Sequence, residues 1–187
     1  LTYFQEVRSH IGMGRASFAN SSGVFLGRDY HFDLARPGVA LYGGNPTPDD
    51  ANPMAQVVRL QAKILQVRDV DSPETVGYGA THKVAGPSRI ATLPIGYADG
   101  FLRSLSSRAT VFIGDYEVPL VGRVSMDLIT IDVTAVPEQL CRPGTMVELL
   151  GPHHTVDDLA DEAGTISYEI LTSLGRRYHR VYAGGAA

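Results

Sequence analysis

Two tyrosines with glycine neighbours are the first residues in this 187-residue sequence that could carry chemistry. Tyr78 stands between Gly77 and Gly79, and Tyr97 follows Gly96. Because glycine has no Cβ, it lets the backbone approach a ligand closely and leaves the neighbouring ring accessible. A phenol beside a substrate can act as a general acid or base. The spacing alone favours a simpler interpretation, in which both rings lie in turns at the ends of strands.

A second group of polar residues suggests an anion site. Asn20 and Ser21 follow one short apolar segment, and Arg36, Pro37 and Gly38 follow the next. If both segments are closing strands of a β/α barrel, these residues lie at its C-terminal rim, where the last loops often bind phosphate. The alternatives are a helix cap without a ligand for the Asn-Ser pair and a surface ion pair for the arginine.

Residues 1–50 predict the last part of a parallel β/α unit. Helical spacing at 1–10 should stop at two following glycines. After it we expect a strand at 15–19, a polar turn at 20–23, a helix at 24–30 and a strand at 32–35. Two strands cannot close a parallel sheet, so its other strands are expected upstream. The segment 43–53 is rich in turn formers, and there we place a boundary between domains 1–50 and 51–187.

Residues 51–187 predict a mostly antiparallel β domain. Short strands separated by turns are expected at 57–67, 89–94, 109–113, 117–124, 128–133 and 145–150. Near the end, Thr155 and Asp158 have the spacing of a capping box that begins a helix. A second helix should begin at Ser167 and stop at Gly175.

The composition narrows the class of protein. Apolar residues make up 44% of the chain and charged residues 19%, as in a globular protein. The net charge of −4 and the scattered Lys and Arg residues argue against a nucleic-acid partner. The apolar stretches are much shorter than the roughly 20 residues of a membrane span. Cys141 has no second cysteine to pair with, which is compatible with the cytoplasm, and the six histidines show no ligand spacing, so we expect no metal site.

Five ordered motifs resemble those of alanine racemase. They are FANSSG at 18–23, DLARPGVALYG at 33–43, VGYGAT at 76–81, PIGYADG at 94–100 and VGRVSMD at 121–127, and TISYE at 165–169 belongs with them. The resemblance runs from the first residue to about Arg180. It implies a mainly β C-terminal domain of the alanine racemase type, preceded here by the last strands and helices of a TIM-type β/α barrel that carries pyridoxal 5'-phosphate.

By this resemblance, Tyr78 takes the Cα proton from L-alanine, and a lysine that holds the cofactor as a Schiff base serves the D-isomer. That lysine belongs to an early barrel strand, and neither Lys63 nor Lys83 lies in its motif context. A free phenol has a pKa of about 10, so a basic tyrosine needs a positive neighbour or another partner that stabilises phenolate. The resemblance also implies that this tyrosine reaches the cofactor of the other subunit, which makes a homodimer necessary.

The resemblance assigns the remaining site residues. Arg36 would face the pyridine nitrogen, and because guanidinium does not readily give up a proton, the ring would be a weaker electron sink. Met126, through its backbone N–H, would receive the substrate carboxylate, and Tyr97 would line the substrate entrance with Arg103 and Asp99. The residues implied to hold the phosphate are Asn20, Ser21, Gly38, Val39 and Tyr168.

The function implied is interconversion of L- and D-alanine by two bases, which supplies D-alanine for peptidoglycan. Because the lysine is not in this chain, we expect the isolated chain to be inactive. Two alternatives stay open at this point. The chain could be an inert module that contributes a dimer surface and Tyr78, or part of a related racemase that acts on serine or a larger amino acid.

Overall fold

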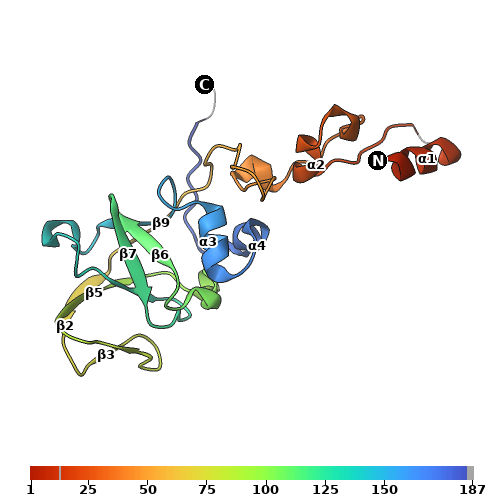
Figure 1. Cartoon of the computed structure of the whole chain (residues 1–187). Coiled ribbons are helices and arrows are strands. Elements are labelled where there is room, and N and C mark those ends of the chain that lie inside the picture. Colours follow the sequence, from red (N-terminus) through yellow and green to blue (C-terminus); the bar gives the residue numbers. More distant parts are fainter. Residues whose placement is uncertain (13, 185–187) are drawn as a thin grey trace. The chain divides into compact units, whose positions relative to one another are not determined.

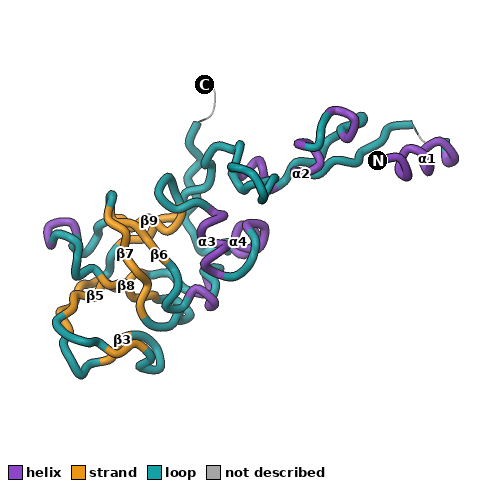
Figure 2. Tube along the Cα trace, viewed as in Figure 1, coloured by secondary structure: helices purple, strands orange, loops and turns teal. Residues whose placement is uncertain are grey.

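The computed structural model describes residues 1–12 and 14–184, and the chain divides into two compact units, Leu1–Val57 and Val58–Ala187 (Figure 1). The first unit consists of helices and loops, and the strands of the described residues lie in the second unit (Figure 2). The domain boundary that the sequence places at residues 50 and 51 stays a prediction.

The first unit begins with the predicted helix, α1 (Thr2–Ile11), which ends at Gly12 with a left-handed φ of 61°. The strands predicted at 15–19 and 32–35 are wrong as strands, because the pairing is reduced to one parallel bridge between Asn20 and Arg36. A parallel pair this short has few ladder hydrogen bonds to extend it. The parallel direction itself is confirmed.

The helix predicted at 24–30 begins earlier and is broken. The side chain of Asn20 accepts a hydrogen bond from the N–H of Gly23 at 2.9 Å, which caps α2 (Ser21–Phe25). A 3₁₀ turn, η1 (Arg28–Tyr30), takes the place of the remaining predicted turn, and a second one, η2 (Val39–Tyr42), follows the arginine segment.

The second unit is built on a seven-stranded sheet whose pairings are all antiparallel, as predicted. The strand order is β1-β9-β6-β7-β8-β5-β2. The seven strands are β1 (Leu60–Lys63), β2 (Gln66–Val70), β5 (Ser88–Leu93), β6 (Thr110–Ile113), β7 (Tyr116–Val121), β8 (Ile129–Asp132) and β9 (Met146–Leu150).

The strand predicted at 57–67 is interrupted at Ile64 and Leu65. These residues separate β1 from β2, which lie at opposite ends of the sheet order. The N–H of Ile64 donates to Thr145 at 2.9 Å, and the N–H of Leu65 donates to Thr92 at 2.9 Å. Because only these two residues connect β1 and β2, the two edge strands of the sheet lie close together and the sheet curls back on itself. A separate two-stranded hairpin, β3 (Thr75–Val76) and β4 (His82–Lys83), was not predicted.

Alternating apolar side chains form the core of this unit. In β8, Ile129 and Ile131 are buried while the residues between and after them are partly exposed, which is the period-two pattern that the sequence predicts. Burying one such side chain fully contributes roughly 1.5–3 kcal/mol. The largest buried members of this core include Phe101, Leu93, Leu105, Ile113, Leu149 and Leu150.

Two helices pack beside this sheet, next to each other (Figure 1). The predicted capping box begins α3 (Val156–Ala163): the N–H of Thr155 donates to Asp158 Oδ2 at 2.8 Å, and Thr155 Oγ1 accepts from the N–H of Asp158 at 3.2 Å. The second, α4 (Ser167–Ser173), begins at the predicted residue and has Leu174 as its C-cap. Short 3₁₀ turns complete the unit: η3 (Tyr97–Asp99), η4 (Arg103–Leu105) and η5 (Glu138–Leu140).

Within the described residues, no helix has both the length and the apolar character that a membrane span requires.

Candidate active site

Tyr78 lies at the tip of the β3–β4 hairpin, and the residue is 67% exposed. The residues around it need left-handed backbone, with φ of 83° at Gly77, 75° at Gly79 and 53° at Ala80. The N–H of Ala80 donates to the carbonyl of Gly77 at 3.2 Å and closes the turn. Glycines are therefore required on both sides of this ring for backbone reasons, and the ring stays accessible.

The Tyr78 turn rests against the segment that follows β7. A Cβ on Gly77 would lie 3.1 Å from the Cα of Gly122, and a Cβ on Gly122 would lie 3.1 Å from the carbonyl oxygen of Val76. Nη1 of Arg123 lies 3.4 Å from the place that a Cβ on Gly79 would occupy. A guanidinium group is thus held beside the turn that carries the phenol.

A hollow of about 300 Å³ lies next to this turn. Its lining includes Tyr78, Arg123, Ser125, Leu128 and Thr130. Ligand pockets in proteins range from roughly 300 to 1,000 Å³, so the hollow suits a small molecule or one end of a larger one.

Tyr97 and Met126 are brought together by two fused loops. The N–H of Tyr97 donates to the carbonyl of Ser125, and the N–H of Ala98 donates to the carbonyl of Met126, both at 3.0 Å. Tyr97 is 42% exposed and Met126 is 54% exposed. In the described part of the chain, the N–H of Met126 has no acceptor, so it is available to a ligand.

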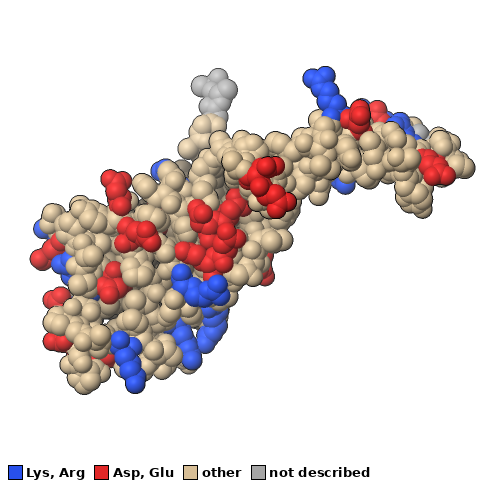
Figure 3. Space-filling view, viewed as in Figure 1, with Lys and Arg blue, Asp and Glu red and all other residues tan. Residues whose placement is uncertain are grey.

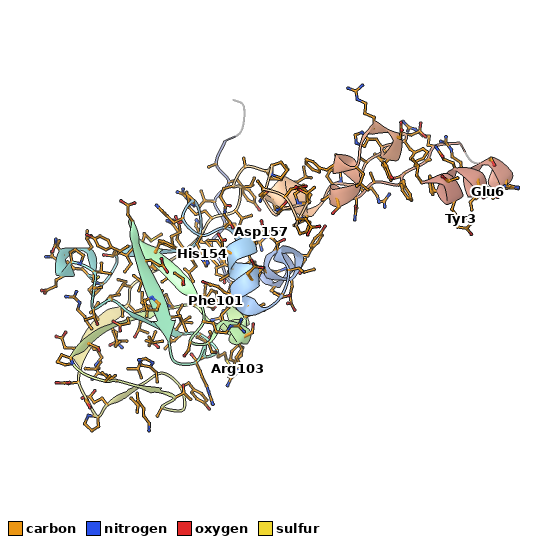
Figure 4. The ribbon with its side chains drawn as sticks, viewed as in Figure 1. Tyr3, Glu6, Phe101, Arg103, His154 and Asp157 are labelled. Carbon is orange, nitrogen blue, oxygen red and sulfur yellow. The ribbon has the colours of Figure 1, made fainter. Side chains whose placement is uncertain are left out.

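Asp99 is a buried residue that stabilises the loop carrying Tyr97. It is 6% exposed, and its Oδ2 accepts a hydrogen bond from the N–H of Gly96 at 2.9 Å. Arg177 pairs with it and also donates to Asp127 Oδ1 at 2.7 Å, and the hydrogen bond to Asp127, followed by the charge of Asp99, raises the pKa of Arg177. The structure therefore places Asp99 under the loop rather than at an exposed entrance. Arg103, in contrast, is exposed (Figure 4).

In the first unit, Ser21 connects the two polar segments that the sequence singled out. The residue is 1% exposed. Its hydroxyl oxygen accepts hydrogen bonds from the N–H of Gly38 at 2.8 Å and from the N–H of Ala40 at 3.3 Å. Because both hydrogen bonds use oxygen lone pairs, the hydroxyl hydrogen is left to donate. The N–H of Val39 has no acceptor among the described residues.

Arg36 lies beside Asn20 through the parallel bridge, and the N–H of Arg36 donates to the carbonyl of Ala19 at 2.8 Å. Its guanidinium donates to the hydroxyl of Ser17, which in turn donates to the carbonyl of Leu34 at 2.8 Å. The structure thus gathers the five predicted residues of this unit at the end of one short pairing: Asn20, Ser21, Arg36, Gly38 and Val39.

Comparison with known proteins decides the family. Residues 57–182 match the model of the alanine racemase C-terminal domain, and residues 1–46 match that of the alanine racemase N-terminal domain. The chain belongs to the alanine racemase family. The predicted family and fold class, a mainly β C-terminal domain after the end of the barrel, are confirmed.

Alanine racemases from several bacteria are similar to the chain. It is 64% identical over 170 residues to the alanine racemase of Rhodospirillum rubrum, covering 91% of this chain and 46% of that protein. It is 52% identical to the catabolic alanine racemase of Mesorhizobium japonicum, covering 97% and 47%. A solved alanine racemase from Bartonella henselae, described with covalently bound pyridoxal phosphate, has a TM-score of 0.89 and 43% identity, covering 96% and 50%. The chain spans about half the length of the curated relatives it matches.

Two further tyrosines of the chain differ in their surroundings. Tyr168 lies in the first turn of α4 and is 42% exposed. Tyr178 is partly buried, and its hydroxyl has no hydrogen-bond partner among the described residues. Burial and the negative charge of Asp99 raise the pKa of Tyr178 above the usual range of a phenol. Tyr178 is therefore a poor candidate for a base, in contrast to the exposed ring of Tyr78.

Sequence reasoning missed Arg123 as a site residue. Its motif carries no local signal for a role, because one arginine between Gly122 and Val124 is typical of any surface turn. The role comes from the approach of the Tyr78 hairpin, which is distant in sequence. On the visible face several acidic side chains gather together, with a set of basic side chains below them (Figure 3). No carboxylate among the described residues forms an ion pair with Arg123.

Proposed function

We propose that this chain is the C-terminal half of an enzyme that interconverts L-alanine and D-alanine with pyridoxal 5'-phosphate. The observation that carries the proposal is the accessible phenol of Tyr78, held on a glycine-flanked turn beside Arg123 and a small hollow, in a chain of this family. Because the chain spans about half of its relatives, the activity belongs to the whole enzyme. Its product would be D-alanine for peptidoglycan, made in the cytoplasm.

In this proposal Tyr78 removes the Cα proton of L-alanine and returns a proton when the reaction runs in the other direction. Arg123 lies beside the same turn, with its Nη1 3.4 Å from the place that a Cβ on Gly79 would occupy, so it places a positive charge near the residues that carry the phenol. The second base is the cofactor lysine, which the family places upstream. Lys63 in β1 and Lys83 in β4 lie on strands of the second unit and do not fit that position.

The polar groups of the first unit fit the phosphate of the cofactor. Ser21 has a hydroxyl hydrogen to donate, Val39 has an N–H without an acceptor, and Asn20 lies next to both segments. Gly38 would act indirectly, because its N–H already holds the oxygen of Ser21. We assign the hydroxyl of Tyr168 to the same phosphate.

Arg36 would donate to the pyridine nitrogen through the guanidinium N–H groups that its bond to Ser17 leaves free. Pyridoxal phosphate, when bound, makes the Cα–H of the attached amino acid acidic. An arginine at the ring nitrogen keeps that nitrogen unprotonated, so the ring withdraws fewer electrons and side reactions are limited.

The substrate would be held by the fused loops of the second unit. The free N–H of Met126 would receive the carboxylate, and the ring of Tyr97 would form a wall of the entrance. We propose that Tyr78 and Met126 serve the cofactor of a partner subunit, so that the working enzyme is a homodimer.

The test is to add the upstream half of the Rhodospirillum rubrum relative to this chain and to measure racemisation with pyridoxal phosphate. The chain alone should be inactive, and the reconstituted enzyme should racemise alanine and develop the visible absorbance of bound cofactor. Tyr78→Phe should lower kcat by about 10²- to 10⁴-fold, as expected for loss of a general base. Tyr116→Phe, which removes an exposed hydroxyl at the start of β7, is the matched control.

Three results would contradict the proposal. An inactive reconstituted enzyme that nevertheless binds cofactor would favour the inert module, and full activity of Tyr78→Phe would remove Tyr78 from the mechanism. Faster turnover of serine than of alanine would favour the related racemase.

A further inference from the structure

The hairpin that carries Tyr78 is too short to fix the position of the ring by itself. Its strands pair only through Thr75 with Lys83 and Val76 with His82, and one more backbone bond joins Val84 to Glu74 at 3.0 Å. An isolated hairpin of this size is marginally stable in water. The position of the phenol must therefore come from the surface on which the hairpin rests.

That surface consists of a small apolar cluster and one close backbone contact. Val76 and Val84 of the hairpin are buried against Ile90 and Val121 of the large sheet. Next to this cluster, the Gly77 and Gly122 backbones approach so closely that a Cβ on either would lie 3.1 Å from the other Cα. A shift of residues 122–124 would consequently move the Tyr78 turn.

Residues 122–124 lie between β7 and β8, where the ladder of the sheet no longer holds the backbone. Two hydroxyl groups take its place, and we call Ser106 and Ser107 the serine clamp. Ser107 Oγ donates to the carbonyl of Gly122 and accepts from its N–H, both at 3.1 Å. Ser106 Oγ accepts from the N–H of Val124 at 3.0 Å and donates to the carbonyl of Arg103 at 2.6 Å.

The serine clamp therefore forms hydrogen bonds to Gly122 and Val124, the residues on both sides of Arg123. The guanidinium of Arg123 lies beside Gly79. Ser107 adopts a left-handed φ of 51°, which is unfavourable for a residue with a Cβ. Glycine would suit that backbone better, but it could not bind Gly122. The two hydrogen bonds of the Ser107 hydroxyl to Gly122 explain why a serine occupies this unfavourable backbone conformation.

We propose that Ser107, supported by Ser106, is a positioning residue for Tyr78 and acts through Gly122. This inference rests on the proposed function for its catalytic consequence, while the contact itself is independent of it. The serine clamp fixes Gly122, Gly122 fixes Gly77, and the phenol is thereby held for proton transfer. Arg123 is held in register with it.

The decisive variants are Ser107→Gly and Ser107→Ala. Ser107→Gly removes the hydroxyl and relieves the left-handed strain, so the protein should fold at least as well as with alanine at this position. The matched control is Ser88→Ala, which removes a partly buried hydroxyl bond to Gly86 at 3.0 Å. Ser88 lies four residues before Thr92 in β5, and Thr92 pairs with Thr130, which in turn pairs with Val121, the residue before Gly122.

In the reconstituted enzyme, both Ser107 variants should lower kcat by about 10- to 100-fold, the range expected when a reacting group is displaced by about 1 Å. The KM for alanine should change much less. The deuterium isotope effect should rise more with α-deuterated L-alanine than with the D-isomer, because Tyr78 serves the L-isomer. Simple loss of folded enzyme would lower kcat without changing either isotope effect.

A second measurement needs no activity. In this chain with ¹³C-labelled tyrosine rings, the Tyr78 signals, assigned with Tyr78→Phe, should shift or broaden in both Ser107 variants and stay unchanged in Ser88→Ala. Unchanged Tyr78 signals and isotope effects in both Ser107 variants would overturn the inference. If the reconstituted wild type does not racemise alanine, the proposed function fails, and the ring signals alone decide whether the clamp positions Tyr78.

Discussion

Asp99 and Arg177 form an ion pair in which Oδ1 of Asp99 lies 3.2 Å from Nε of Arg177. The two partners differ in exposure, because the Asp99 side chain is 9% exposed and the Arg177 side chain is 52% exposed. Arg177 also reaches Asp127, one residue after Met126. The C-terminal segment thereby ties together the loops that carry Tyr97 and Met126.

Asp99→Ala should lower the free energy of unfolding by about 1–3 kcal/mol, because the N–H of Gly96 loses its buried acceptor. Arg177→Gln should have a much smaller effect, because water and salt screen an exposed guanidinium. Urea unfolding of both variants checks this order. Asp115→Ala, at a side chain that is 98% exposed, is the control and should stay within about 0.5 kcal/mol of wild type. Equal losses for Asp99→Ala and Arg177→Gln would contradict the assignment.

Gly96→Ala should destabilise the fused loops by a steric effect alone. The φ of Gly96 is −162°, which any residue can adopt, but a Cβ there would lie 2.3 Å from the carbonyl oxygen of Ser125. Relieving this overlap should cost about 1–3 kcal/mol. Amide hydrogen exchange at Tyr97 and Ala98 should become faster, because both donate to that loop.

The control for this change is Gly86→Ala. A Cβ on Gly86 would have no atom within 4 Å, so its stability and its amide exchange should match wild type. Protection of the Tyr97 amide in Gly96→Ala equal to that in Gly86→Ala would show that the loops are not held together as described.

The strands of the large sheet could be predicted because a strand that is buried on one face has apolar residues at alternate positions, as at Ile129 and Ile131. The β3–β4 hairpin could not, because strands of two residues are too short to show a period. The strands expected in the first unit failed for another reason. Their apolar composition suits a buried parallel sheet, but the pairing that forms is one bridge.

The candidate site shows the same division. The glycines beside Tyr78 could draw attention to its ring, because left-handed backbone at Gly77 and Gly79 is a local requirement, but its predicted role came from the ordered motifs. Arg123 and Ser107 could not, because their contacts join segments that are distant in sequence and leave no local pattern. Sequence motifs therefore predicted the reacting group, and only the fold showed which residues contact its turn.

Cys141 should resist thiol reagents in the native protein. It is 4% exposed, and burial raises the pKa of its thiol, an effect that the positive charge of Arg89 offsets only in part. The reactive thiolate is therefore scarce and covered. Labelling with a chromogenic disulfide at neutral pH should be slow in buffer and complete quickly in denaturant. Rapid labelling of the folded chain would show that β9 and the turn before it open readily.

The stability of the second unit should depend on the protonation of His154, which lies just before α3 (Figure 4). This residue is 4% exposed; its Nδ1 lies 2.9 Å from the carbonyl oxygen of Leu149 and its Nε2 lies 3.4 Å from Glu162 Oε2. Burial by itself lowers the pKa of His154. The nearby carboxylate of Glu162, the hydrogen bond to Leu149 and the charge of Asp158 outweigh it and raise the net pKa.

A raised pKa means that the folded state binds the proton more tightly than the unfolded chain does. The stabilisation is fully present below the pKa of an unfolded histidine, about 6.5, and is lost as the pH rises through the higher folded value. His154→Gln should remove this part of the pH dependence, whereas His179→Gln, at an exposed position, should keep it. Urea unfolding followed from pH 5 to pH 9, which brackets the usual histidine pKa of about 6.5, gives the comparison. We expect this loss of stability with rising pH in the wild type and in His179→Gln. If the stability of the wild type instead rises from pH 5 to pH 9, burial and not Glu162 governs the pKa of His154.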